Sequence, residues 1–373
     1  MNFNLTEQQE MFQKEVRKFA EAEFTPLVDI MDKQNNFPHE IRPKLAAMNL
    51  YGIPFDPKYG GAGSDYISLA LALEEIARVL APIAIHVQLQ HVVGDRFNKL
   101  ATEEQKLEWM VPIAEGKKVG CFAFTEPDTG SNPRMIKTVA RETSDGYILN
   151  GTKRFITNAP WADVALIFAK LESDLSLFFV ETDTPGFSTD KKMDKLGLRG
   201  TDLTDVIMDD VHIPKDHLMG GKGGKFDALK DAMTVGKLCL SAQCVGLMQA
   251  ALEEAIRYSM TRMHFDEHIF DLQAIHWLLG EMASRLEASR WLTYRAAFLK
   301  DEGLDTIKEM AITKLFVTQT AVDVCRWGMQ VHGAYGISKE YKIERIFRDA
   351  KMYELLEGTS EIQRELIVKR LPR

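Results

Sequence analysis

Three stretches of the sequence combine residues that could bind a cofactor and move a proton. The segment 121–131 (CFAFTEPDTGS) places Gly and Pro among small hydroxyl residues, which leaves backbone amides and hydroxyls free to bond a ligand. Residues 151–158 (GTKRFITN) put an aromatic ring beside hydroxyl side chains. Residues 355–364 (LLEGTSEIQR) contain a carboxylate, Glu357, followed by a glycine that permits close approach of a ligand. Taken singly, each stretch is equally well explained as a turn or a helix cap.

Two further patterns look catalytic but lack the context that their chemistry needs. His264 and His268 form the H-x-x-E-H pattern of inverted zinc proteases, and on a helix the two imidazoles would share one face. The residues around them favour a break between helices, so a zinc hydrolase is a distant alternative and we assign no metal ligands. The glycine-rich loop 220–225 fails as a P-loop, because Phe226 stands where Ser or Thr should hold magnesium.

The composition predicts an ordered chain of two or three domains. Of the 373 residues, 45% are hydrophobic and 27% are charged. The formal net charge is −8 and we find no basic stripe, so nucleic acid is not an expected partner. We find neither an apolar run near the roughly 20 residues that span a membrane nor a signal peptide, and expect a soluble cytoplasmic protein. The four cysteines form no C-x-x-C pair, and we expect buried free thiols.

The elements that must position these residues change type twice along the chain, which predicts three domains and an α+β fold. Residues 1–117 read as an N-terminal α-helical domain, whose first helix is capped by Thr6 with Gln9. Residues 118–225 carry short runs rich in Val, Ile and Phe, and predict a middle antiparallel β-sandwich or barrel with a hairpin turn at Asn150-Gly151. Residues 226–373 contain four long helical stretches, about 226–263, 270–302, 305–330 and 340–370, which predict a C-terminal four-helix bundle.

In their order and spacing, the stretches resemble the acyl-CoA dehydrogenase family over nearly the whole chain. The first two family patterns, T-E-P-x-x-G-S and [WF]-I-T-N, correspond to Thr125–Ser131 and Phe155–Asn158. The patterns of the last domain are R-x-x-F with a Gln eleven residues after the Arg, Q-x-x-G-x-x-G, and R-D-A-K followed by E-G-T-S-E-I-Q-R. The first of these three patterns corresponds to Arg262, Phe265 and Gln273, and the second to Gln330, Gly333 and Gly336. The third corresponds to Arg348–Lys351 together with Glu357–Arg364.

The resemblance implies FAD as the cofactor, held by residues of two subunits. In the family, the first two motifs and the C-terminal motif contact the FAD of their own subunit, which implies Phe122, Phe124, Thr125, Ser131, Phe155, Thr157, Thr359 and Glu361. The motifs of the bundle contact the FAD of a partner subunit, which implies Arg262, Phe265, Gln273, Gln330 and Gly333. A cofactor shared across an interface implies a homo-oligomer, and the family is commonly a tetramer.

The resemblance assigns the proton abstraction to Glu357. A short or medium acyl-CoA would lose its α-proton to Glu357 and a β-hydride to flavin N5, giving a trans-2-enoyl-CoA. The electrons would pass to an electron-transfer flavoprotein. A carboxyl group in an apolar pocket is expected to have a raised pKa. Two alternatives with the same fold stay open, a 2-enoyl-CoA reductase and a member acting on an unusual acyl-CoA, because the reaction runs both ways.

The implied substrate contacts, and the positions near them, depart in part from the family pattern. These contacts are Ser131, Lys237, Leu356 and Gly358. Lys237 stands where many relatives have Arg, and Leu356 where many have Tyr. Gly236 occupies the position from which a subset of relatives supplies the base, which leaves Glu357 alone in that role. The segment 86–91 (HVQLQH) is unusually polar, and we interpret it either as an exposed polar face or as a sign of a polar acyl group.

Overall fold

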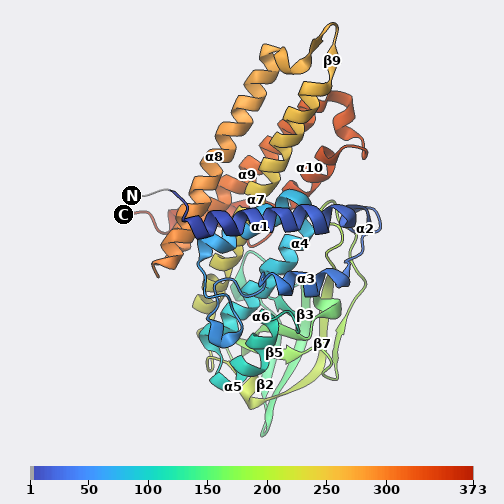
Figure 1. The fold of residues 1–373 in the computed structure, drawn as a ribbon. Coiled ribbons are helices and arrows are strands. Elements are labelled where there is room, and N and C mark those ends of the chain that lie inside the picture. Colours follow the sequence, from blue (N-terminus) through green and yellow to red (C-terminus); the bar gives the residue numbers. More distant parts are fainter. Residues whose placement is uncertain (1–3, 373) are drawn as a thin grey trace.

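The computed structural model describes residues 4–372, which fold in the predicted order of a helical, a β and a second helical region (Figure 1). The fold class is α+β, as predicted. In Figure 1 the strands of the middle region lie at one end of the molecule and the long helices α7, α8 and α9 extend to the other end, where β9 lies, with α1 crossing between the two ends. The chain therefore has two ends of different architecture, joined by the helices that cross the middle.

The N-terminal region is built around one long helix, α4. Its helices are α1 (Glu7–Phe24), α2 (Val28–Asp32), α3 (Arg42–Ala47), α4 (Tyr66–Leu100), α5 (Glu103–Gln105) and α6 (Val111–Ala114). The predicted cap of α1 is confirmed, because Thr6 Oγ1 accepts from the Gln9 amide at 3.2 Å and Gln9 Oε1 accepts from the Thr6 amide at 3.0 Å. α4 kinks at Leu80, two residues before Pro82, and packs against both α1 and α7.

The middle region is a single eight-stranded sheet in the order β6-β7-β3-β2-β4-β5-β8, with β1 paired to β4. The strands are β1 (Gly120–Ala123), β2 (Val139–Glu142), β3 (Gly146–Thr157), β4 (Val164–Leu171), β5 (Asp174–Glu181), β6 (Phe187–Thr189), β7 (Leu203–Pro214) and β8 (Leu218–Met219). Most neighbours are antiparallel, while β1–β4 and β2–β4 are parallel. The parallel pairing of β1 with β4 places the end of β1, where the T-E-P segment begins, beside the middle of β4.

The predicted hairpin turn at Asn150-Gly151 is wrong, because both residues lie inside β3. The register between β3 and β7 shifts there, between Leu149 and Gly151, so the pair forms a bulge. The Asn150 side chain holds the bulge by donating to Asp210 Oδ1 at 2.8 Å and accepting from the Asp210 amide at 2.9 Å. Gly151 has φ +148°, and a Cβ atom there would lie 2.5 Å from Thr138 Oγ1, so only glycine fits.

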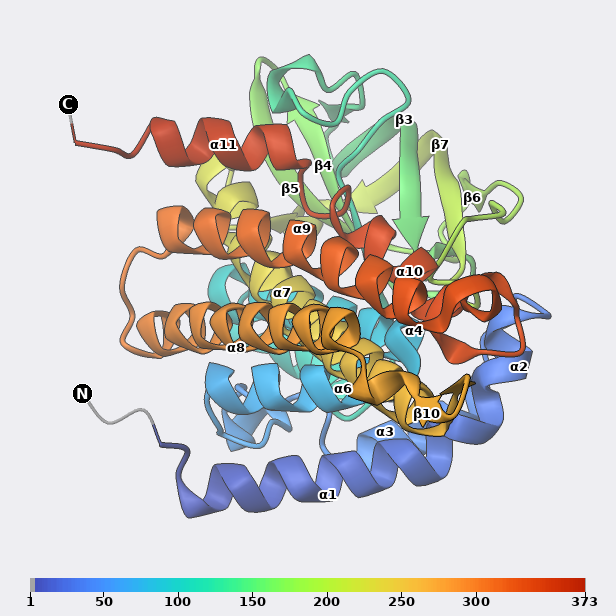
Figure 2. The same ribbon diagram turned by 90° about the horizontal axis from the view of Figure 1, so that it is seen from above.

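The C-terminal region is a bundle in which the fourth predicted helix is two helices. The long helices are α7 (Phe226–Thr261), α8 (Gln273–Asp301) and α9 (Ile307–His332), and the stretch 340–370 forms α10 (Lys342–Tyr353) and α11 (Ser360–Val368). The break falls at Glu357 (φ +53°) and Gly358 (φ +88°), whose left-handed backbone cannot continue a helix. Glu357 therefore lies in a turn between two helices, as Figure 2 shows for the chain between α10 and α11.

The R-D-A-K motif ties α10 to the rest of the chain. Arg348 donates to Asp32 Oδ1 and Oδ2 at 2.9 and 2.8 Å. Asp349 accepts from the Leu198 amide at 2.6 Å. The carbonyl of Arg348 lies so close to Gly197 that a Cβ atom on that glycine would be 2.3 Å away. This motif therefore fixes α10 to the N-terminal and middle regions shortly before the turn that carries Glu357.

Burial of side chains in the core bears on two further expectations. The four cysteines are free and buried, as predicted. Within residues 4–372, α7 is the one helix that is long and apolar enough to cross a membrane, and 89% of its most apolar window is buried inside the protein. Core helices of water-soluble proteins have the same composition, so this helix gives little reason to expect a membrane.

Candidate active site

The turn between α10 and α11 is held in place by one buried ammonium group, that of Lys314. Lys314 of α9 donates from Nζ to the carbonyl of Glu354 and to the carbonyl of Gly358, both at 2.9 Å. Gln363 of α11 also donates to the Gly358 carbonyl, at 2.8 Å. These bonds satisfy backbone oxygens that the helix break leaves without helical partners. The turn is thus a fixed platform, and its one side chain with acid–base chemistry in the interior is Glu357.

The Glu357 carboxyl group points at α7 and α4. A Cβ atom added to Gly236 of α7 would lie 2.4 Å from Glu357 Cδ, so the missing side chain leaves the space that the carboxyl group fills. Gln88 of α4 donates from Nε2 to Glu357 Oε1 at 3.4 Å. Burial raises the pKa of Glu357 to about 7, against the opposing charges of Lys237 and Lys314 and the bond from Gln88. A carboxyl group with this pKa can take up and release a proton near neutral pH.

A second set of predicted residues lies where β1 and β3 meet. The T-E-P segment is fixed through Glu126, which accepts from Lys153 Nζ at 2.9 Å and from the Thr138 amide at 3.0 Å. Lys153 also donates to the Phe124 carbonyl at 3.1 Å, and the Arg154 amide donates to the Thr125 carbonyl at 2.7 Å. Sequence reasoning missed Glu126 and Lys153, although a lysine between the two motifs was a visible signal. Their ion pair is fully buried and holds the segment rigid.

The aromatic residues of this set differ in exposure. Phe155 is 54% exposed with φ +62°, and the guanidinium of Arg154 lies 5.2 Å from its ring centroid. Phe124 is only 8% exposed, and both Phe124 and Phe122 pack against Phe168 at ring-centroid distances of 5.9 and 5.5 Å. The ring of Phe124 is therefore buried and that of Phe122 is partly buried, while Phe155 offers an open apolar face.

The surroundings of Phe155 fit a flat aromatic cofactor such as FAD. Thr157 follows on the same strand and is partly buried, and Asn158 has a buried Oδ1 without a hydrogen-bond partner in the described chain. Buried polar atoms normally have partners, so this oxygen calls for a ligand or a water molecule. Thr125 is partly buried and Ser131 is exposed at the end of the T-E-P segment. On the C-terminal turn, Thr359 occupies the N-cap position of α11 without a side-chain capping bond, and the Glu361 carboxylate is exposed beside it.

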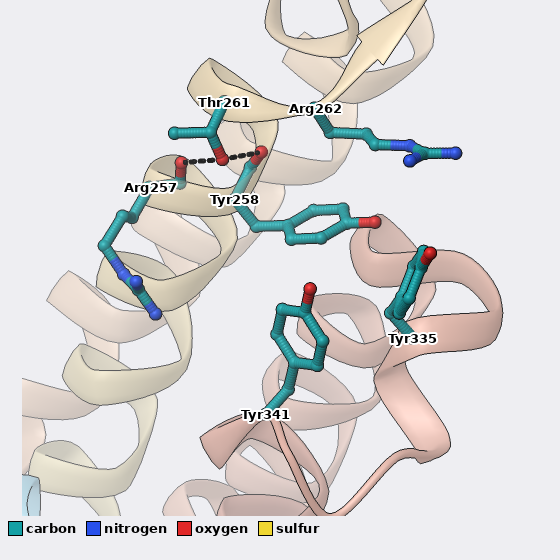
Figure 3. Close-up of a pocket in the computed structure, with 6 residues that line it drawn as sticks. All are labelled: Arg257, Tyr258, Thr261, Arg262, Tyr335 and Tyr341. Atoms are coloured by element: carbon teal, nitrogen blue, oxygen red, sulfur yellow. Dashed lines mark hydrogen bonds between the residues drawn. The ribbon is translucent and has the colours of Figure 1, made fainter.

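The residues predicted to reach a partner's cofactor gather at the opposite end of the bundle. Arg262, 5.5 Å from the ring of Tyr335, helps to line a cavity of about 340 Å³ with Tyr258 and Tyr341 (Figure 3). Phe265 is 89% exposed at the tip of a small hairpin, and the remaining residues are also exposed: Gln273, Gln330 and Gly333. Gln330 is 16 residues beyond Lys314 on α9, which at the rise of a helix is roughly 24 Å. Within one chain, the structure does not bring this group to Glu357 or Phe155.

The zinc alternative loses its structural basis. His264 and His268 lie on the two-stranded hairpin of β9 (Met263–His264) and β10 (Glu267–His268), where His264 pairs with Glu267. The shared helical face that the H-x-x-E-H pattern requires does not exist. Among residues 4–372 no three His, Cys, Asp or Glu side chains gather in a way that could hold a metal ion.

The polar segment of α4 is buried, so its interpretation as an exposed face is wrong. His86 contacts the Tyr51 hydroxyl at 2.9 Å, and burial lowers the pKa of His86 to about 3. Gln90 Oε1 accepts from the Gly120 amide at 2.9 Å, and His91 bonds the Leu50 carbonyl at 2.9 Å. Gln88 differs from these three, because its amide faces the carboxyl group of Glu357.

The predicted substrate residues surround the same carboxyl group on two sides. Lys237 follows Gly236 on α7 and is only 3% exposed, and burial lowers its pKa to about 8 although Glu357 opposes the shift. Leu356 and Gly358 are the sequence neighbours of Glu357 and are partly buried. Ser131, by contrast, lies in the middle region on the exposed end of the T-E-P segment.

Comparison with known proteins identifies the family. The acyl-CoA dehydrogenase N-terminal, middle and C-terminal domain profiles match residues 6–117, 121–211 and 223–371. An acyl-CoA dehydrogenase of Bacillus subtilis (strain 168) is 39% identical over 374 residues, with 99% of each chain covered. The caffeyl-CoA reductase-Etf complex subunit CarC of Acetobacterium woodii is 37% identical over 369 residues, with 97% of each chain covered. The solved structure of butyryl-CoA dehydrogenase from Megasphaera elsdenii superposes with a TM-score of 0.97 at 34% identity and covers 100% of both chains.

The chain belongs to the acyl-CoA dehydrogenase family, which confirms the resemblance drawn from the motifs. It is an oxidoreductase that acts on acyl-CoA, and its cofactor is FAD.

Proposed function

We propose that this enzyme oxidises a short or medium acyl-CoA to a trans-2-enoyl-CoA, with Glu357 as the base that removes the α-proton. The observation that carries the proposal is the turn geometry, which places one buried carboxyl group with a pKa of about 7 in the space opened by Gly236. A carboxylate with this pKa is ionised in a large fraction of molecules near neutral pH, yet basic enough to accept a proton. Electrons leave the enzyme to an electron-transfer flavoprotein, as the name of the Acetobacterium woodii relative suggests.

The turn also supplies a donor for the charge that develops when the α-proton leaves. In residues 4–372 the amide of Glu357 has no internal acceptor, so it is free to donate to a thioester carbonyl oxygen. A fixed amide aimed at a developing oxyanion lowers the barrier to forming an enolate-like state. The chemistry that bound FAD supplies is acceptance of the hydride from the β-carbon. The residues proposed to hold it in its own subunit are Phe122, Phe124, Thr125, Ser131, Phe155, Thr157, Thr359 and Glu361.

The proposed site is completed by a second copy of the chain. One face of α8 carries an apolar stripe of exposed aromatic side chains. It consists of Trp277 (68% exposed), Trp291 (43%) and Phe298 (50%), which are spaced by fourteen and seven residues. We infer that this stripe lies in the interface of a homo-oligomer, with a tetramer expected from the family. Light scattering on the purified holoenzyme tests the inference, because a monomeric mass at micromolar concentration would contradict it. A cytoplasmic location is part of the same proposal.

The variant Glu357→Gln tests the base directly. We expect the purified variant to keep the visible flavin bands, because the amide preserves the size of the side chain. Under anaerobic conditions a panel of acyl-CoAs should bleach the wild-type bands and leave those of the variant unbleached, with the rate reduced at least about a thousand-fold. Glu354→Gln, on the same turn and paired with Lys351, is the matched control and should bleach normally. Normal bleaching of Glu357→Gln would exclude Glu357 as the base.

The reverse direction is a second candidate, favoured by the name of the relative from Acetobacterium woodii, a caffeyl-CoA reductase subunit that is 37% identical to this chain. The same base would then return the α-proton to a 2-enoyl-CoA. Product analysis separates the two directions, since a reductase consumes the 2-enoyl-CoA when reduced electron carrier is supplied. The panel of CoA esters should include aryl-substituted and dicarboxylic acyl groups as well as saturated chains.

A further inference from the structure

A continuous chain of buried polar side chains ends on the Glu357 carboxyl group. Tyr353, near the end of α10, donates from its hydroxyl to Gln243 Oε1 at 2.8 Å. Gln243 of α7 donates from Nε2 to Gln88 Oε1 at 2.6 Å. Gln88 of α4 donates from Nε2 to Glu357 Oε1 at 3.4 Å. Three helices therefore each contribute one residue to a single line of hydrogen bonds.

All three donors point the same way, toward Glu357. A phenol hydroxyl has a single hydrogen, and here it occupies the carbonyl oxygen of Gln243, which leaves the Gln243 amide to face Gln88. The carbonyl oxygen of Gln88 is occupied in turn, so its amide faces the carboxyl group. Hydrogen bonds in such a chain polarise one another, and each donor strengthens the next. The orientation of Gln88 at the carboxyl group is thus set by Tyr353, two side chains away.

The three side chains of this hydrogen-bonded line are buried, so their polar groups cannot bond water instead. Tyr353 and Gln243 are 0% exposed and Gln88 is 3% exposed. A buried amide without a partner carries a desolvation cost, so these three groups are constrained to bond one another. Burial also raises the pKa of Tyr353 well above its usual value, so its hydroxyl keeps its proton and remains a donor.

We propose that Tyr353, Gln243 and Gln88 form a positioning relay that orients the Glu357 carboxylate toward the substrate and stabilises its charged form. The proposal rests on the proposed function, since it assigns the relay to the same base. None of the three residues is a titrating acid or base at neutral pH, and none is proposed to touch the reacting atoms. The charged and titratable groups that face the carboxyl group from the other side chains around it are Lys237 and Cys239 on α7 and Lys314 on α9.

The test is the pH dependence of the rate of flavin bleaching in the holoenzyme. The rate is measured by stopped-flow absorbance with an acyl-CoA that reduces the wild-type enzyme. Gln88→Met removes the donor at the carboxyl group, so the acid limb of the rate profile should move to higher pH by about one unit. Tyr353→Phe leaves every contact except one hydroxyl and should move the limb in the same direction by about half a unit. A loss of packing alone would change the yield or the melting temperature but not the position of this limb.

The double variant Gln88→Met/Tyr353→Phe supplies the sharpest criterion. A relay requires that Tyr353 acts through Gln88, so the second substitution should add no further shift once Gln88 is gone. Additive shifts, or an unmoved limb in Tyr353→Phe, would overturn the relay. Tyr294→Phe is the matched control, because Tyr294 is also a buried tyrosine but donates to Glu74 Oε2, at 2.7 Å, and should leave the limb in place.

Failure of the relay and failure of the base give different results. If Glu357→Gln still bleaches with an acyl-CoA, the base is elsewhere and both proposals fall. If Glu357→Gln loses bleaching while Tyr353→Phe and Gln88→Met keep the wild-type profile, the base stands and the relay is wrong. Should Gln88→Met fail to fold, Tyr353→Phe by itself still decides the outcome, because it changes the least volume.

Discussion

Glu357 occupies the space that the absent side chain of Gly236 leaves on α7. A Cβ atom on Gly236 would lie 2.4 Å from Cδ and 2.6 and 2.7 Å from the two carboxyl oxygens, well inside van der Waals contact. The two residues are 121 positions apart in the sequence: Gly236 lies inside α7, and Glu357 lies in the turn between α10 and α11. The glycine is therefore a specific requirement of the carboxyl group that faces it.

Gly236→Ala should displace the carboxyl group and lower the rate of flavin bleaching about a hundred-fold, because a base misplaced by about 1 Å loses this much. The variant should keep its FAD, since the contacts of the flavin-binding strands are untouched. Gly280→Ala is the matched control, also inside a long helix, where a Cβ atom meets nothing within 4 Å. The control should bleach at the wild-type rate and gain up to about 1 kcal/mol in stability. A Gly236→Ala enzyme of wild-type activity would show that the carboxyl group does not depend on this space.

The pH dependence of kcat/KM should report the free enzyme's Glu357. Burial raises the pKa of this carboxyl group to about 7, and the deprotonated form is the active one. We expect kcat/KM to fall about ten-fold per pH unit below 7 and to level off between pH 7 and about 8, where Lys314 begins to lose its proton. A limb near pH 4.5, the ordinary value of a glutamate, would show that the carboxyl group is solvated in the working enzyme.

The same pKa predicts that Glu357 costs stability at alkaline pH. The folded state binds the proton more tightly than the unfolded chain, so the free energy of unfolding falls as the pH rises from about 4.5 to 7. Above pH 7 the full cost of the buried charge is present. Glu357→Gln carries no charge and should therefore melt about 2–4 °C higher than wild type at pH 8, with no difference at pH 4. Differential scanning fluorimetry at the two pH values measures this, and an equal difference at both would point to packing instead.

How much of this arrangement the sequence predicted depends on whether the interaction is local. The capping box joins Thr6 and Gln9, three positions apart, and was predicted correctly. The Asn150-Gly151 pair is a strong local signal for a hairpin, yet a cross-strand bond to Asp210 places it in a bulge. A short-range pattern cannot contain a partner that is 60 residues away.

The turn that carries Glu357 shows the same limit. The stretch 340–370 has helical periodicity throughout, and the break at Glu357 depends on Lys314 of another helix, which bonds the two carbonyls of the turn. The polar segment 86–91 allows an exposed face as one interpretation, because its hydrogen-bond partners come from five other segments, including the loop at Tyr51 and strand β1. The motifs pointed to Glu357 through the family. Gln88 lay in a segment that was notable only for its polarity, and Gln243 had no signal within its own segment.

Lys153→Met tests the rigidity of the T-E-P segment. Removing one partner leaves the Glu126 carboxylate buried without its ion pair, which costs about 3–5 kcal/mol. We expect the affinity for FAD to fall at least about ten-fold, because the segment proposed to line the cofactor loses its anchor. Lys137→Met is the matched control, since Lys137 pairs with Asp128 in the same segment but both side chains are largely exposed. Equal FAD affinities of the two variants, measured by titration of the apoprotein, would contradict this role.

The ammonium of Lys314 gives the enzyme an upper limit of pH that has nothing to do with its reaction. Burial lowers the pKa of Lys314 to about 8, so mild alkali neutralises the ammonium group that bonds the carbonyls of Glu354 and Gly358. An amine holds two carbonyl oxygens less firmly than an ammonium does. The proposed base, Glu357, becomes ionised at about pH 7. The hydrogen bonds from Lys314 that hold its turn begin to weaken about one pH unit higher. We therefore expect the enzyme to be active only in a narrow pH interval, with its lower edge set by the proposed base, Glu357, and its upper edge by Lys314, which holds the turn.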